Sequence, residues 1–191
     1  MAGRRPARTP RPIGFVAELE RAADLAGDNA APMIDIANEL PYAGQTGRAV
    51  EFVERALRLD PASIDRYRYA QRDVYFYARR FEDAARTAEA MDHPSKLSTA
   101  LIYAQLGRTE ELFRWRSALL AETPEFSAEL RLDLVGDFLP AAVSERALFL
   151  ESIAKAGLPM CARPEQLAKK PGMRRMPECE AERVKPAAPR T

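Results

Sequence analysis

The stretch Gly47-Arg-Ala-Val-Glu-Phe-Val-Glu-Arg-Ala-Leu-Arg-Leu-Asp-Pro61 indicates the fold class of this chain. Its apolar residues recur at helical spacing and its charged residues occupy the other side, which is the pattern of an amphipathic helix. The helix should end at Asp60-Pro61, because proline disfavours α geometry in the preceding residue and lacks an amide hydrogen. Another apolar helix is expected upstream at 31–42, and Gly44 to Gly47 breaks the chain between the two. The unit is therefore a helix, a tight turn, a helix and a proline.

Two similar units follow along the chain. Each contains a pair of expected helices, and the units are closed by Pro94 and Pro124. Because the closing prolines are about thirty residues apart, the sequence predicts a helical repeat protein. The expected helices of these two units span 67–78, 81–91, 96–106 and 110–121. The turn positions of the three units are Gly44, Ala78 or Arg79, and Gly107.

The residues of these units resemble the tetratricopeptide repeat. That family places apolar or aromatic residues in the first helix, glycine at the turn, alanines in the second helix and a final proline. The middle unit fits two registers, which put either Tyr75 or Val74 in the aromatic position, and the sequence leaves both open. The first unit matches the family pattern at Met33, Ile36, Ala37, Leu40, Gly44, Ala49, Ala56 and Pro61. The third unit matches it at Thr99, Ala100, Tyr103, Gly107, Leu119 and Pro124.

The resemblance implies an all-α fold, a short right-handed solenoid of helical hairpins with a C-terminal capping helix. The repeat domain is expected to span 15–159. A basic arm at 1–14 and a basic tail at 160–191 are rich in proline and charge, and both are expected to be disordered. Within the domain we expect a half repeat at 15–29, repeats at about 30–63, 64–92 and 93–126, and capping helices at 127–159.

A narrower resemblance covers about 61–159. Three segments are similar to the helical-repeat tail that follows the catalytic domain of some bacterial class III adenylate/guanylate cyclases. They are Ala100-Leu-Ile-Tyr-Ala-Gln-Leu-Gly-Arg108, Pro124-Glu-Phe-Ser127 and Lys155-Ala-Gly-Leu-Pro159. The cyclase catalytic domain is absent from this chain, so no catalytic residue is carried over. This resemblance implies a detached regulatory tail that is inactive by itself.

Charge and cysteine usage set further expectations. The formal net charge is +1, but the first twelve residues carry four arginines and no acid. Cys161 and Cys179 lie in the tail, and with a single histidine in the chain no tetrahedral zinc site can be assembled locally. We therefore expect free thiols, no metal, no cofactor and a cytoplasmic location. No apolar run approaches the ~18–20 residues that span a bilayer, so no membrane span is expected.

Motifs of the common enzyme classes are missing from the sequence. Gly44-Gln-Thr-Gly47 lacks the Lys-Ser/Thr of a phosphate-binding loop. His93 stands between an aspartate and a proline and is expected to lie in a surface loop rather than to act as a general base. The acidic pairs Glu82-Asp83 and Glu110-Glu111 are expected to stabilise the first turns of their helices. The sequence therefore predicts a protein that is not an enzyme.

The predicted function is non-catalytic binding of a protein or peptide segment in the concave groove, with no specific nucleic-acid partner. Tyr75, Phe76 and Tyr77 span about 200° of one helix, so at least one ring should lie on a surface. An Asn38→Ala, Tyr77→Ala double variant is expected to lose the partner with little change in melting temperature. The uncapped N-terminal end offers a surface for self-association. In the register of the resemblance the groove residues are Asn38, Tyr42, Tyr69, Asp73, Tyr77, Leu101 and Gln105.

Overall fold

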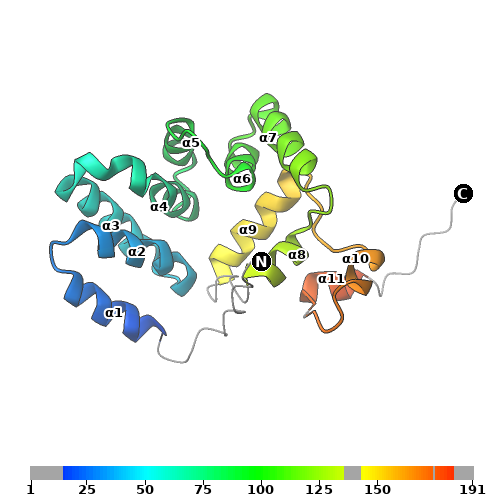
Figure 1. Cartoon of the computed structure of the whole chain (residues 1–191), viewed down its shortest axis with the longest axis horizontal. Coiled ribbons are helices and arrows are strands. Elements are labelled where there is room, and N and C mark those ends of the chain that lie inside the picture. The colour runs from blue at the N-terminus through cyan, green and yellow to red at the C-terminus, as the bar shows by residue number, and fades with distance from the viewer. Residues whose placement is uncertain (1–14, 136–142, 174, 183–191) are drawn as a thin grey trace, which may run out of the picture.

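A computed structural model describes residues 15–135, 143–173 and 175–182 of the chain, and every regular element in these ranges is a helix (Figure 1). The all-α prediction is therefore confirmed, as a composition rich in alanine, leucine, arginine and glutamate favours. The expected basic arm at 1–14 and the last part of the tail, 183–191, lie outside the described residues. Among the helices of the described ranges, none combines the length and the apolar character that crossing a membrane requires.

The first seven α-helices pack in the order of the sequence. They form three antiparallel pairs, α2 with α3, α4 with α5 and α6 with α7, and α1 packs on α2. Each predicted pair is present, although the middle pair begins earlier than expected. The elements are α1 (Phe15–Ala26), α2 (Ala30–Glu39), η1 (Leu40–Ala43), α3 (Thr46–Leu59), η2 (Pro61–Ser63), α4 (Ile64–Tyr77), α5 (Phe81–Glu89), α6 (Lys96–Leu106) and α7 (Thr109–Glu122).

Each pair turns at a residue with a left-handed backbone. Gly44 and Gly107 have φ of 75° and 68°, values that glycine adopts without steric cost. In the middle pair the corresponding residue is Arg79, with φ of 59°, whereas Ala78 is ordinary at φ −74°. Of the two positions that the sequence left open, Arg79 is therefore the turn residue.

Ion pairs connect alternate helices along the outer side of the pairs. Arg80, just before α5, reaches Glu54 of α3 at 2.7 Å. Arg108, just before α7, reaches Glu82 of α5 at the same distance. Exposed pairs of this kind contribute little to stability, typically about 0–1 kcal/mol. They nevertheless join the start of α5 to α3 and the start of α7 to α5.

The apolar interior consists of two cores, and α4 contributes to both. Val74 of α4 belongs to the first core, which α1, α2, α3 and α4 form, whereas Tyr75 and Phe76 belong to the second core, which extends from α4 to α9. Tyr77 is half-buried, so the ring that faces solvent most on α4 is that of Tyr69. A helix with neighbours on two sides buries more of its circumference than a single apolar stripe, which explains the crowded aromatic residues.

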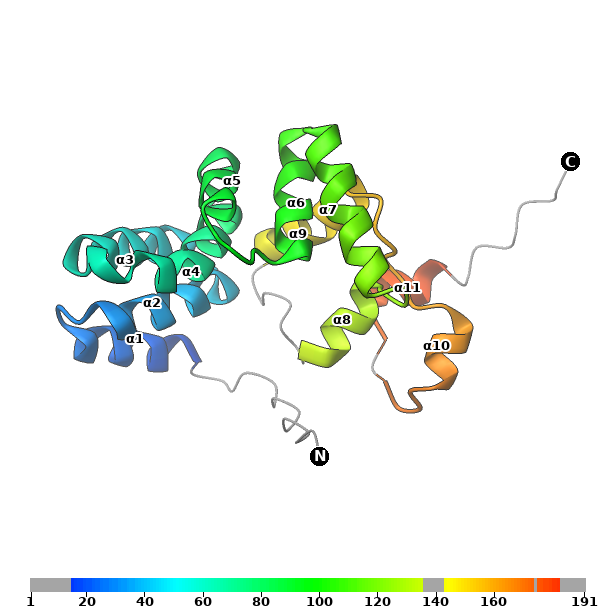
Figure 2. The same cartoon turned by 45° about the horizontal axis from the view of Figure 1, so that its top comes forward.

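The C-terminal helices do not continue the series of pairs. They are α8 (Ala128–Val135), α9 (Val143–Lys155), α10 (Pro164–Ala168) and α11 (Pro177–Glu182). Helix α9 ends before Gly157, whose φ of 61° is the left-handed conformation in which glycine commonly ends a helix. It lies beside α6 in both views (Figures 1 and 2) and buries Leu148 and Ile153 in the second core.

The tail differs from the sequence-based expectation. We expected disorder from 160 to 191, but residues 160–173 and 175–182 fold back beside α8 (Figure 2). The amides of Ala128 and Glu129 donate to the carbonyls of Pro159 and Met160, at 2.9 Å each. The expectation of free thiols is also corrected, because Cys161 and Cys179 form a disulfide. Composition alone suggested disorder. It does not show the groups of α8 that hold this segment, because they lie some thirty to fifty residues away in sequence.

Candidate partner-binding surface

Carboxylates and tyrosines gather where α2 and η1 meet α4. Tyr69, Asp73 and Tyr77 are four residues apart on α4 and therefore share one face. The Tyr69 hydroxyl donates to Asp35 Oδ1 of α2 at 3.3 Å, and the Tyr77 ring meets Tyr42 of η1 edge-on, with 5.6 Å between ring centroids. These two contacts align the first helices of successive pairs. We call Asp35, Tyr42, Tyr69, Asp73, Tyr77 and Glu145 the acidic row.

Tyr69 and Tyr77 of the acidic row are hydrogen-bond donors that stay protonated. Burial raises the pKa of Tyr69, and the carboxylate of Asp35 raises it further. Burial also raises the pKa of Tyr77 well above its ordinary value, with added contributions from Tyr42 and from the Asp73 carboxylate. At neutral pH the row therefore offers hydroxyl donors beside carboxylate acceptors.

The carboxylates of the row are only partly neutralised. Arg72 pairs with Asp73 through Nε at 2.8 Å. Within the part of the chain that the structure describes, neither Asp35 nor Glu145 has an ion pair with a cationic side chain. The row therefore carries net negative charge, which attracts cationic groups.

Helix α9 closes one end of the acidic row. Its Glu145 is buried and accepts a hydrogen bond from Thr46 Oγ1 of α3 at 2.7 Å. The Glu145 carboxylate also contributes to the raised pKa of Tyr77. Sequence reasoning missed Glu145, because α9 was expected to cap the array and no local pattern shows that it reaches α3, 99 residues away in sequence.

The predicted groove residues fall into two groups. Tyr69, Asp73 and Tyr77 share a face of α4, and Tyr42 of η1 meets Tyr77, whereas Asn38 is half-buried on α2. Leu101 is 3% exposed and belongs to the second core. Gln105 is bonded to α9: its Nε2 donates to Ser152 Oγ at 2.7 Å, and Lys155 Nζ donates to its Oε1 at 2.9 Å. Helix α9 thus occupies the side of α6 that the repeat resemblance assigns to a partner.

A shallow pocket of about 600 Å³ lies at the other end of α2 and α4. Several of its polar groups already have partners in the chain. Asp28 pairs with Arg55, and Tyr67 donates from its hydroxyl to Asp60 Oδ2 at 2.9 Å. Hydrogen bonds from Ser63 and then Tyr67 lower the pKa of Asp60. The lining cation Arg66 has no ion pair among the described residues, and its charge also lowers the pKa of Asp60.

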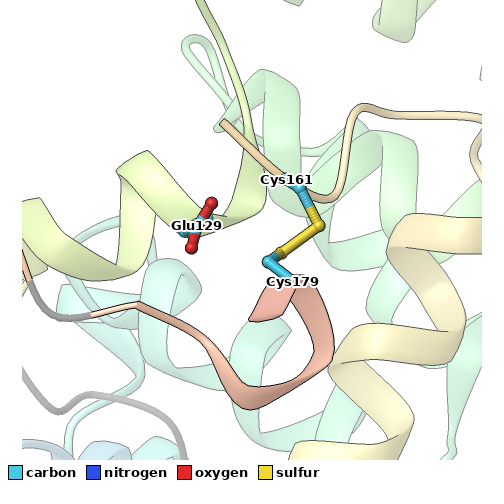
Figure 3. Close-up of side chains that lie close together, drawn as sticks. All are labelled: Glu129, Cys161 and Cys179. Atoms are coloured by element: carbon cyan, nitrogen blue, oxygen red, sulfur yellow. A yellow bond between two sulfur atoms is a disulfide. The ribbon is translucent and has the colours of Figure 1, made fainter. Parts of the chain in front are cut away.

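Glu129, Cys161 and Cys179 form a group whose ligand atoms lie within 4.8 Å of one another (Figure 3). The two sulfurs are bonded to each other. Glu129 Oε1 accepts from Arg175 Nε at 2.5 Å and from the Met176 amide at 3.1 Å, and Oε2 accepts from the Ala162 amide at 2.8 Å. Both the sulfurs and the carboxylate oxygens are thus engaged, and the group acts as a structural junction between α8 and the tail.

The residues weighed for acid–base chemistry occupy the positions that the sequence predicts. His93 is exposed in the connection between α5 and α6. Glu82 and Asp83 lie in the first turn of α5, and Glu110 and Glu111 in the first turn of α7. There carboxylates interact favourably with the helix dipole.

No protein-family model, curated protein or solved structure matches this chain. The resemblances to tetratricopeptide repeats and to the cyclase tail therefore stay predictions. The structure establishes an all-helical protein whose helices pack in sequence order, with an acidic row of side chains between the first two pairs.

Proposed function

We propose that this chain is a non-catalytic interaction module that binds a basic, extended segment of a partner protein along the acidic row. The observation that carries the proposal is the contact between Tyr69 and Asp35. It places a tyrosine that is 39% exposed beside a carboxylate without a cation among the described residues. A tyrosine combines ring area with a hydroxyl donor, and tyrosines are enriched among the residues that dominate protein interfaces.

The finer fold belongs to the same proposal, in which the three pairs stack as tetratricopeptide-type hairpins. Two observations support it. Asp35 and Tyr69, in contact on successive first helices, are 34 residues apart, which is the length of that repeat. The turn of every pair also has a residue in the left-handed conformation, the position at which that repeat places glycine.

The length of the acidic row limits what it binds. At a rise of 1.5 Å per helical residue, Asp35 and Tyr42 are about 10 Å apart along the helix axis, and this distance is the length of this part of the row. An extended segment advances about 3.3 Å per residue, so about three partner residues lie against this part of the row. Two arginine or lysine side chains in such a segment would reach Asp35 and Asp73, and a guanidinium would stack on the Tyr69 ring. A short basic motif is the expected ligand.

The test uses fluorescence polarisation with labelled hexapeptides that carry arginines, and a matched set in which glutamates replace them. Wild-type protein should bind the arginine peptides, and binding should weaken as salt is added. Tyr69→Ala combined with Asp35→Asn should weaken binding by about 2 kcal/mol or about thirtyfold. Leu25→Ala combined with Asp24→Asn, at exposed positions on α1, is the matched control and should bind as wild type. Equal binding by the folded Tyr69/Asp35 variant, or equal binding of the glutamate peptides, contradicts the proposal.

A further inference from the structure

We infer that Cys161 and Cys179 form a redox-controlled latch, whose reduction by a small-molecule thiol releases the tail from α8 while α1 to α7 stay folded. We call residues 160–173 and 175–182 the strap. The inference does not depend on the proposed binding function, because it rests on the disulfide and on the contacts of Glu129 with the strap (Figure 3).

The secondary structure of the strap is too short to be stable by itself. Helix α10 has five residues and α11 has six. Isolated helices shorter than about 12–15 residues are marginal in water. The strap therefore depends on its attachment to the rest of the protein, and the nature of that attachment decides how easily it detaches.

The strap is attached mainly by polar contacts and by the disulfide. Its buried apolar side chains are few, chiefly Ala162, Met176 and Cys179 itself. Glu129 binds three groups of the strap, and Gln166 Nε2 donates to the Glu125 carbonyl at 2.8 Å. Bonds to the charged Glu129 carboxylate contribute more than neutral ones, but when the strap is released both partners form bonds to water instead. The covalent closure of the loop therefore carries much of the strap's local stability.

The strap also reaches α9. Arg146 Nη2 of α9 pairs with Glu178 of α11 at 2.7 Å, and Glu178 is the neighbour of Cys179 in sequence. Release of the strap would break this pair at the same time as the contacts of Glu129. The two effects leave the Glu129 carboxylate without Arg175 and leave the first half of α9 without its contact to α11.

The chemistry of release is a thiol–disulfide exchange. A dithiol reagent attacks the sulfur of Cys161, the less buried of the two residues, and Cys179 leaves as a thiolate that takes up a proton. The second thiol of the reagent then displaces Cys161, which also takes up a proton. Two electrons and two protons pass to the protein, and the reagent becomes its own disulfide.

Every free thiol counted in the reduced protein comes from this disulfide, because Cys161 and Cys179 are the two cysteines of the chain. The experiment follows amide hydrogen exchange of the full-length protein, oxidised and then reduced with dithiothreitol, with alkylation and mass measurement to count free thiols. On reduction, the amides of Ala162 and Met176 should exchange at least about tenfold faster, whereas the amide of Tyr103 in α6 should not change. A Cys161→Ser, Cys179→Ser variant should match the reduced wild type without any reductant.

Three results would overturn the inference. Equal protection of the strap before and after reduction would mean that the polar contacts alone hold it. Loss of protection at Tyr103 in both the reduced protein and the serine variant would make the disulfide a global staple. Retention of the strap in the reduced protein by one equivalent of added Zn²⁺, reversed by a chelator, would make the pair a metal site together with Glu129.

Discussion

Replacing Tyr77 by alanine tests whether this ring belongs to the interior or to the binding surface. The ring lies 5.6 Å from that of Tyr42 and 5.3 Å from that of Phe76, edge-on to both, and it packs against the second core. Burial dominates the raised pKa of its hydroxyl, so the group is poorly solvated. In contrast to the sequence-based expectation, this packing predicts that a variant without the ring has a lower melting temperature.

The size of the effect follows from burial. Truncating a fully buried aromatic residue to alanine costs about 3–5 kcal/mol, and a half-buried ring should lie near the lower limit, about 3 kcal/mol. For a protein of this size each kcal/mol lowers the melting temperature by about 2–4 °C, so Tyr77→Ala should melt about 6–12 °C below wild type.

Thermal unfolding followed by circular dichroism measures this shift, with two matched variants. Tyr77→Phe keeps the ring and loses the hydroxyl, and should cost about 1 kcal/mol. Tyr69→Ala removes a more exposed ring of the same row and should change the melting temperature by less than half as much as Tyr77→Ala. If Tyr77→Ala melts within about 2 °C of wild type, the ring is not packed as described, and Tyr77 returns to the set of residues available to a partner.

Three further predictions test the turn, the junction at Glu129 and the side of α6 that α9 covers. Arg79→Gly should raise the free energy of unfolding, measured by urea denaturation, by about 0.5–1 kcal/mol, because glycine tolerates the positive φ. Gly107→Ala should lower it by about 1 kcal/mol through the positive φ alone, because the new Cβ meets no atom within 4 Å. Burial raises the pKa of Glu129, but the hydrogen bonds from Arg175, Ala162 and Met176 outweigh burial and hold this pKa below its ordinary value of 4.5. The stability that Glu129 contributes is therefore present above pH 4.5 and is lost as the pH falls through the folded pKa, so Glu129→Gln should flatten the acid limb of a stability–pH curve. Gln105→Ala should lower the free energy of unfolding by about 1–2 kcal/mol through lost bonds to α9, yet leave binding of arginine peptides unchanged.

The pairs of helices could be predicted from the sequence because the signals that define them are local. Apolar spacing, Gly44, Gly107 and the closing prolines all act within one or two turns of the chain. The middle turn was ambiguous because arginine carries no sign that it adopts a positive φ. The register of α4 stayed open for another reason: Val74 and Tyr75 are both buried, each in a different core, so neither single-stripe register describes the helix.

The candidate surface could be predicted only where it depends on neighbouring helix pairs. Tyr69 and Asp73 follow from helical spacing on α4, and Asp35 meets Tyr69 from the preceding pair. Leu101 and Gln105 were placed in the groove by the same logic, but α9 returns to cover them from about fifty residues away. Hydrophobic periodicity predicts which residues share a face of a helix, but it does not identify the distant segment that packs on that face.

The order of the tail illustrates the same limit through a single charge. In sequence Glu129 is one acid among several at the start of a helix, and Arg175 is one cation in a basic, proline-rich tail. A buried carboxylate is costly unless hydrogen bonds and a cation compensate it, and a short charged segment cannot order itself without an anchor. The Glu129 carboxylate accepts hydrogen bonds from Arg175 and from two strap amides, which anchors the strap. The strap in turn compensates the buried charge of Glu129 and covers it from water. Neither half of this arrangement can be recognised from its own composition. The two cysteines of the same tail were expected to be free thiols, and their disulfide closes the loop whose two ends bind Glu129.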